Sequence, residues 1–81
     1  MMKTVQIRYF AAFRDAAGTS EEQVQSSAAN LAALFDEMVI RHDALHQESA
    51  AKVARNDVLA DWQDEFEDGD EVLFFPPVAG G

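Results

Sequence analysis

Cysteine is absent from the 81-residue sequence. Without a thiol, the chain can form no disulfide, supply no thiolate metal ligand and use no catalytic cysteine. Any sulfur that takes part in its function must therefore come from another molecule.

Basic residues are few. Six lysines and arginines stand against fifteen aspartates and glutamates, which gives a formal net charge of −9. Phosphate backbones and anionic membranes repel such a surface, so we expect no nucleic-acid and no membrane partner. A basic protein partner is the natural complement of this charge.

Long apolar runs are missing as well. No segment approaches the roughly 20 apolar residues of a membrane-spanning helix, and Met1-Met2-Lys3 leads straight into a strand pattern rather than a signal peptide. We therefore expect a cytoplasmic protein with a single domain. No nucleophile stands beside a base, and so small a domain houses no deep active-site cavity, so we expect no catalysis by the chain alone.

What the sequence does contain is a regular succession of strand and helix patterns. Alternation of apolar and polar residues predicts the strands. Apolar residues at helical spacing after the N-cap residue Asn30 predict the main helix. Gly18 predicts the end of a short helical turn. Asn56-Asp57 predicts a tight hairpin turn, and Trp62 and Phe66 are predicted core residues. The expected elements are strands 4–10, 21–25, 52–55, 58–60 and 72–75, a helical turn at 13–17, and a main helix from 31 to about 41 or 45.

This order predicts an α+β fold in which one face of a mixed sheet of about five strands covers one main helix. Val72-Leu73-Phe74-Phe75 is the most apolar strand and so belongs near the centre of the sheet, with the first strand as its parallel neighbour. Such an arrangement is the β-grasp. We expect residues 1–75 to form the domain and residues 76–81 to form a flexible tail.

The last six residues, Pro76-Pro77-Val78-Ala79-Gly80-Gly81, are the most informative segment. Two prolines end the preceding strand, and two glycines without Cβ atoms fit a slot too narrow for other residues. We therefore expect the chemistry to occur at the carboxylate of Gly81. The alternative is a frayed tail that happens to end in glycine.

Alternation also places Phe10, Leu59, Leu73 and Phe75 on strand faces opposite the core residues. If these outer faces coincide, the four side chains form an apolar patch beside the tail, which is typical of a docking surface. The alternative is that some of them pack beneath a loop.

Three other groups have simpler interpretations. His42 and His46 stand four apart, but two ligands without a third are weak evidence for a metal, so none is expected. The six acids between Asp64 and Glu71 predict a solvated acidic edge. Arg14 either pairs with a nearby acid or forms an ion pair with a partner.

Several of these segments resemble the molybdopterin synthase small subunit, a ubiquitin-like sulfur carrier family. The resemblance lies in Asn56, in Asp68-Gly69-Asp70-Glu71-Val72, and in the ending from Phe74 to Gly81. Phe13-Arg14-Asp15-Ala16-Ala17-Gly18-Thr19 and Asn30-Leu31-Ala32-Ala33-Leu34 are also similar, whereas residues 42–52 are not.

The resemblance implies a cycle at Gly81. An adenylating enzyme activates the carboxylate with ATP, a sulfurtransferase converts the acyl-adenylate to a thiocarboxylate, and the tail enters the large subunit of molybdopterin synthase to donate sulfur to precursor Z. It also implies a heterotetramer, no bound cofactor, and a hydrophobic face used by both partners. The implied partner-binding residues are Phe10, Arg14, Leu59, Leu73, Phe75, Pro76, Pro77 and Val78, with Gly80 and Gly81 as the reactive end.

Other functions fit the same residues. A related carrier could serve thiamine or tRNA thiolation, although the aromatic-Pro-Pro approach is unusual for the thiamine type. A ubiquitin-like modifier would instead be joined through Gly81 to lysines, and a plain interaction module would have no terminal chemistry.

Overall fold

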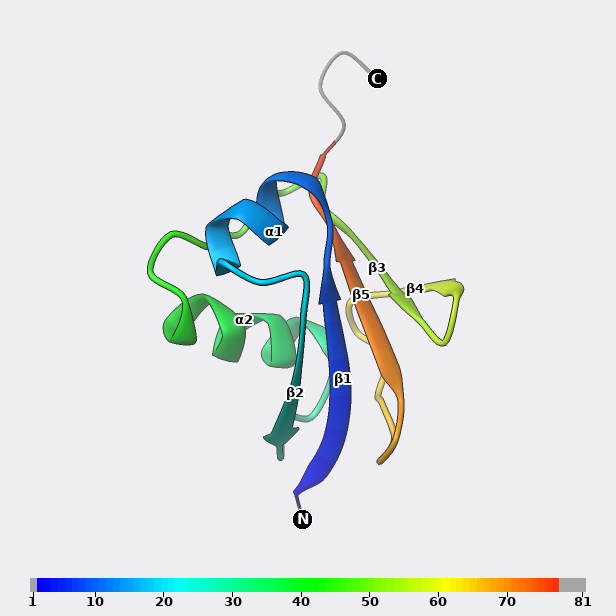
Figure 1. The fold of residues 1–81 in the computed structure, drawn as a ribbon. Helices are drawn as coiled ribbons and strands as arrows, with labels where there is room; N and C mark the ends of the chain where they lie inside the picture. Colours follow the sequence, from blue (N-terminus) through cyan, green and yellow to red (C-terminus); the bar gives the residue numbers. More distant parts are fainter. Residues whose placement is uncertain (1, 78–81) are drawn as a thin grey trace.

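A computed structural model describes residues 2–77 of the chain. Five strands and two helices follow one another along the sequence (Figure 1). Their bounds are β1 Lys3–Tyr9, α1 Ala11–Ala17, β2 Glu21–Ser26, α2 Leu31–Arg41, β3 Lys52–Arg55, β4 Val58–Ala60 and β5 Glu71–Phe75.

The five strands form one mixed sheet in the order β2-β1-β5-β3-β4. β5 is parallel to β1 and antiparallel to β3, whereas the β1–β2 and β3–β4 pairs are antiparallel. Val72, Leu73 and Phe74 of β5 are all buried. The predictions that the most apolar strand is central and that the first strand is its parallel neighbour are confirmed.

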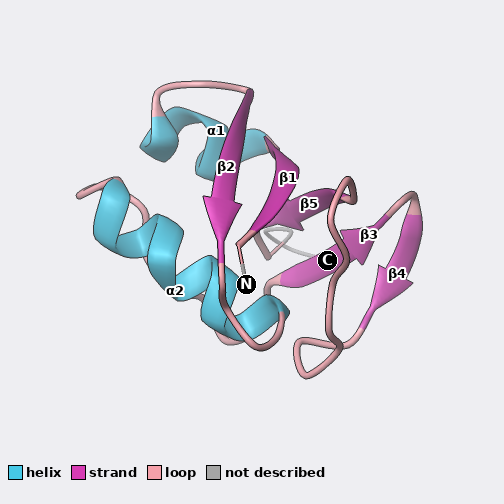
Figure 2. Cartoon of the chain, turned by 90° about the horizontal axis from the view of Figure 1, so that it is seen from below, coloured by secondary structure: helices cyan, strands magenta, loops and turns pink. Residues whose placement is uncertain are grey.

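One face of the sheet, the inner face, packs against the helices (Figure 2). Its buried side chains come from alternate positions of the strands, as strand geometry requires. They meet the apolar stripe of α2 and the aromatic residues of α1 and of the 61–70 connection. The buried cluster consists of Val5, Ile7, Tyr9, Phe13, Val24, Leu31, Leu34, Phe35, Met38, Leu45, Ala51, Val53, Phe66, Val72 and Phe74.

The main helix begins where the sequence predicts. The Asn30 side chain accepts a hydrogen bond from the Ala33 N–H at 2.8 Å, which satisfies one of the free donors of the first turn. The carbonyls of Trp62 and Asp64 accept from the N–H groups of Ala32 and Leu31, both at 2.9 Å. The 61–70 connection is therefore held to the start of α2.

The short helix is longer than predicted at its first end. It begins at Ala11 rather than Phe13, because Ala11 takes a φ of 50° that turns the chain from β1 directly into the helix. Its other end is as expected. Gly18 adopts a φ of 76°, and its N–H donates to the Arg14 carbonyl.

A polar cluster joins the edge strand β2 to the end of α2. The Glu22 carboxylate accepts a hydrogen bond from the Tyr9 hydroxyl at 2.7 Å, lies 2.6 Å from His42 Nε2, and is 3.2 Å from Arg41 Nη1. Burial acts to raise the pKa of Glu22, but the hydrogen bonds from Tyr9 and His42 and the charges of His42 and Arg41 outweigh it, so the pKa lies below its ordinary 4.5. Burial, followed by the hydrogen bond to Glu22, raises the pKa of Tyr9.

We expect Glu22→Gln to lower the free energy of unfolding at pH 7 by about 1–3 kcal/mol, because a carboxylate with several donors is replaced by a neutral amide. A lowered folded pKa means that Glu22 contributes its full stability above the unfolded pKa and loses it as the pH falls through the folded pKa. The difference between variant and wild type, measured by urea unfolding, should therefore shrink in acid. Glu21→Gln is the matched control, since Glu21 is exposed at the neighbouring position of β2. A loss that does not vary with pH would contradict the account.

The β3–β4 turn allows a second prediction. Asn56 and Asp57 have φ values of 53° and 69°, the left-handed pair that favours Asn-Gly at this position. Asp57→Gly should raise the free energy of unfolding by about 0.5–1 kcal/mol, whereas Asp57→Val should lower it, because a β-branched side chain resists a positive φ. Thermal unfolding of both variants checks this, and a shift in the same direction for both would contradict it.

Candidate functional site

The candidate site lies where the central strand ends. β5 stops at Phe75 and leads into Pro76 and Pro77, both half-buried, at the end of the sheet that α1 also contacts (Figure 1). The prolines lack a backbone N–H, so they end the strand as expected. The expected site residues Val78, Gly80 and Gly81 lie outside the described residues.

The outer faces of the strands coincide, as the patch requires. In β1–β5 pairing Tyr9 lies beside Phe74, so the next residues, Phe10 and Phe75, adjoin on the other face. Pairing of Leu73 with Ala54, and of Ala54 with Leu59, carries the same face across β3 to β4. Phe10, Leu59, Leu73 and Phe75 therefore lie on one face, opposite the helices.

Two aromatic rings form the firmest part of this face. The rings of Phe10 and Phe75 stack with centroids 4.6 Å apart and an interplanar angle of 11°. Each shields the other, so both are half-buried rather than fully exposed. Phe10 immediately precedes α1, so the stack ties the start of that helix to the last residue of β5.

Leu59 and Leu73 differ in exposure. Leu59, on the edge strand β4, is 73% exposed and is available to a partner. The expectation that Leu73 belongs to the exposed patch is wrong, because it is only 7% exposed. Leu73 lies in the middle of the sheet between Arg8 and Ala54, so neighbouring strands flank it on both sides.

Charged side chains border the patch. Arg8 lies 3.7 Å from both Glu21 and Glu71 on the outer side. Arg14 is exposed on α1, and its nearest acid, Asp15, is 3.9 Å away. An exposed pair at this distance is weak. Arg14 therefore does pair with a nearby acid, as one interpretation expected. Because the pair is weak and exposed, the guanidinium is still accessible to a partner.

The acidic run is more than a solvated edge. Asp70 is 9% exposed, and its carboxylate accepts from the Glu67 N–H at 2.7 Å and from Asn56 Nδ2 at 2.9 Å. Arg55 Nε lies 3.5 Å away. The expectation of a solvated edge is wrong for Asp70, which holds the start of β5 against the β3–β4 turn. Asn56 Oδ1 completes this link by accepting from the Glu71 N–H.

Among residues 2–77, no three histidine, aspartate or glutamate side chains are arranged to hold a metal ion. His42 places its Nε2 atom against Glu22 instead. No helix in this part of the chain has the length and apolar character to cross a bilayer.

Comparisons with known proteins agree with this geometry. The ThiS family model matches residues 7–81. The molybdopterin synthase sulfur carrier subunit of Escherichia coli is 35% identical over 80 residues, covering 95% of this chain and 99% of that protein.

Solved structures with the same fold include a putative molybdopterin converting factor subunit 1 from Pyrococcus furiosus, with a TM-score of 0.80, 32% identity, and coverage of 94% of this chain and 99% of that one. Subunits 1 and 2 of the molybdopterin-converting factor from Helicobacter pylori form a complex in which the matched chain has a TM-score of 0.60 and 29% identity, with full coverage of both chains. The expected ubiquitin-like β-grasp, a mixed sheet of five strands packed on one main helix, is confirmed.

The stacked rings predict an energetic coupling. Phe10→Ala and Phe75→Ala should together destabilise the fold by less than the sum of the single changes, with a coupling of about 0.5–1.5 kcal/mol, because either change alone removes the stack. Urea unfolding of the four proteins measures it. Phe10→Ala combined with Leu59→Ala is the control and should be additive. Additivity in the first pair would show that the stack contributes nothing beyond burial.

Proposed function

This chain belongs to the ThiS family, and we propose that it is a sulfur carrier protein that acts as the small subunit of molybdopterin synthase. The observation that carries the proposal is the match of 35% identity to the sulfur carrier subunit of E. coli over nearly the whole of both chains. The described fold supports it by directing the chain from the central strand into the segment that ends in Gly80-Gly81.

In the proposed cycle a separate adenylating enzyme uses ATP to activate the carboxylate of Gly81. The carboxylate oxygen attacks the α-phosphorus of ATP, and pyrophosphate leaves. The resulting acyl-adenylate carries AMP as a good leaving group. A sulfurtransferase delivers sulfur at the sulfide level, which attacks the acyl carbon, displaces AMP and leaves a thiocarboxylate. The chain itself binds no cofactor and does not catalyse these steps.

The loaded chain then binds the large subunit, and its thiocarboxylate donates sulfur to precursor Z. Tethering the thiocarboxylate to a docked domain raises its effective concentration at the receiving site. The absence of cysteine fits this role, because the carrier has no thiol that would compete for the sulfur. A heterotetramer of two small and two large subunits in the cytoplasm is part of the proposal.

Docking is assigned to the outer face and the residues that follow it. Phe75 and Phe10 form the rigid aromatic centre, and exposed Leu59 extends the apolar area. Aromatic residues held in place before binding lose little conformational entropy when a partner covers them. Arg14 supplies an ion pair at the border, and Pro76, Pro77 and Val78 contact the partner next to the reactive Gly80 and Gly81 in sequence. Leu73 lies on the same face but offers a partner little accessible area.

The proposal predicts that different residues serve docking to the large subunit and sulfur transfer, so that separate variants impair each. Phe75→Asp should weaken binding to the large subunit at least about tenfold, because a charge replaces a central aromatic contact. Ile40→Asp is the matched control, since Ile40 is 81% exposed on α2, away from the outer face.

Deleting Gly80 and Gly81 should leave the unfolding midpoint unchanged and abolish molybdopterin formation in a mixture of precursor Z, large subunit, adenylating enzyme, ATP and a sulfur source.

Contrary outcomes are specific. Full activity of the truncated chain would leave a plain interaction module. Normal transfer to another acceptor, with none to precursor Z, would move the assignment to thiamine or tRNA thiolation. Recovery of Gly81 joined to lysines of other proteins would make the chain a modifier.

A further inference from the structure

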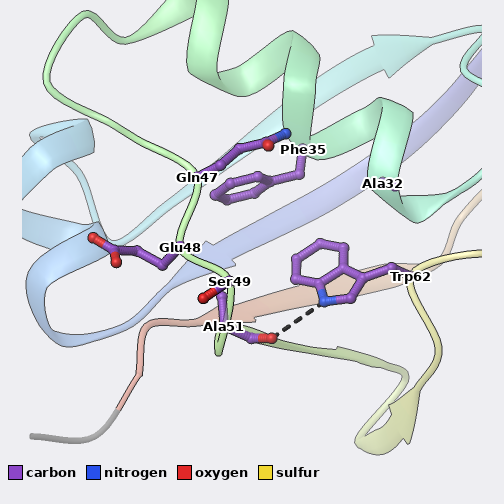
Figure 3. A pocket seen from close by; sticks show the side chains of 7 residues that line it. All are labelled: Ala32, Phe35, Gln47, Glu48, Ser49, Ala51 and Trp62. Carbon is purple, nitrogen blue, oxygen red and sulfur yellow. Dashed lines mark hydrogen bonds between the residues drawn. The ribbon is translucent and has the colours of Figure 1, made fainter.

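A cavity opens on the helix side of the molecule, away from the outer face. It has a volume of about 400 Å³ and lies between α2, the 42–51 loop and the 61–70 connection (Figure 3). That volume is within the range of sites that hold a small molecule or a single side chain. None of the residues assigned to docking of the sulfur-transfer partner lines it. We call it the Trp62 cavity, after the residue that forms one wall.

Two aromatic rings build its apolar part. Phe35 of α2 and Trp62 meet edge to face, with centroids 5.5 Å apart. Small side chains, Ala32 and Ala51, leave the space beside them open (Figure 3). The cavity therefore forms because two large aromatic side chains lie next to two alanines that do not fill the space between them.

The Trp62 ring is fixed in position. Its indole N–H donates to the Ala51 carbonyl at 3.2 Å, and the ring stacks on Phe74 with centroids 5.9 Å apart and an interplanar angle of 9°. Since the only polar group of the ring is already bonded, Trp62 can contact a ligand only through the apolar edge or the π face of its ring.

Glu48 is the charged residue of the cavity lining. The lining contains no lysine or arginine. Glu48 lies at the rim, with its carboxylate directed outward rather than between the rings (Figure 3). Gln47, also in the lining, donates to the carboxylate of Asp36 just outside. With a net charge of −9 for the chain, this environment repels anions and attracts cations.

Aromatic rings with a glutamate at the rim suit one kind of side chain above others. Tryptophan is the best partner for a cation above a ring, and the planar guanidinium of arginine both stacks on aromatic faces and binds carboxylates through paired donors. A lysine ammonium is more strongly hydrated, so it would lose more hydration free energy on entering a half-buried site.

We propose that the Trp62 cavity receives an arginine side chain of a basic protein partner. The guanidinium stacks on Trp62, and the exposed Glu48 side chain turns toward the rings to pair with it, while the methylene stem fills the space beside Ala32 and Ala51. The site is on the opposite layer of the molecule from the stacked Phe10 and Phe75. A partner held there would leave the outer face free, so two proteins can bind the chain at once. The proposal does not depend on sulfur transfer.

Trp62 is the only tryptophan of the chain, so its fluorescence reports directly on the cavity. The probe is a short capped peptide with a single arginine, and its control is the same peptide with citrulline, which has the same shape without the charge. The arginine peptide should change the emission saturably, and the citrulline peptide should bind at least about fivefold more weakly. Added salt should weaken the arginine peptide selectively.

Glu48→Gln tests the ion pair. It should weaken arginine-peptide binding by about two- to fivefold, the usual range for an accessible pair, and leave citrulline-peptide binding unchanged. Asp15→Asn removes an exposed acid from α1, outside the cavity lining, and is the matched control that should change neither. Both variants alter exposed side chains, and unchanged thermal unfolding confirms their folds.

Three results would overturn the proposal. One is no saturable emission change up to the solubility limit of the arginine peptide. Another is equal binding of the citrulline peptide, which would assign the cavity to neutral ligands. The third is an equal loss in Glu48→Gln and Asp15→Asn, which would reduce the effect to the general charge of the chain. Each readout is independent of Gly81, so failure here leaves the sulfur-carrier proposal standing.

Discussion

The register of β5 between β1 and β3 is the constraint on which the remaining structure depends. Pairing of Val72 with Ile7 and of Phe74 with Tyr9 places both β5 side chains in the core and leaves Phe75 on the outer face beside Phe10. A slip of one residue would bury Phe75 and expose Phe74, because successive strand residues point to opposite faces. The link from Asp70 and Asn56 to the start of β5 opposes such a slip, since it fixes where the strand begins. The same register therefore sets the core, the outer face and the place where the chain leaves the sheet after Phe75.

The scarcity of basic residues shapes both surfaces. Arg8, Arg41 and Arg55 each lie close to at least one acid of this chain, and Lys3 donates to the Phe66 carbonyl. Most of the acids cannot have a basic residue as a neighbour, since the sequence holds fifteen acids and only six lysines and arginines. Long-range attraction then favours basic partners, while contact specificity comes from apolar and aromatic groups. The outer face offers a stacked pair of rings, and the helix side offers a cavity with Glu48 at its rim.

Local signals predicted most of the fold. Asn30 as a cap, Gly18 as a helix end, and Asn56-Asp57 as a hairpin turn each act within a few residues, and the structure has them where expected. The bounds of β3 and β4 were predictable for the same reason. The apolar character of residues 72–75 also predicted that β5 is central and parallel to β1. The side-chain contacts that this pairing creates were not predictable. Glu22 meets His42 only because β2 lies beside the end of α2, Asp70 is buried only because β5 adjoins the turn after β3, and Leu73 is covered by neighbours on both sides. The Trp62 cavity likewise arises from segments far apart in sequence.

The measurement that tests the central claim most directly is fragment mass spectrometry of the last residues, on protein purified from its own cells. Intact mass is insufficient, because oxidation of any of the three methionines mimics the replacement of oxygen by sulfur. The account predicts sulfur in place of one carboxylate oxygen at Gly81. A bare carboxylate there, even after incubation with ATP, an adenylating enzyme and a sulfur source, would contradict it.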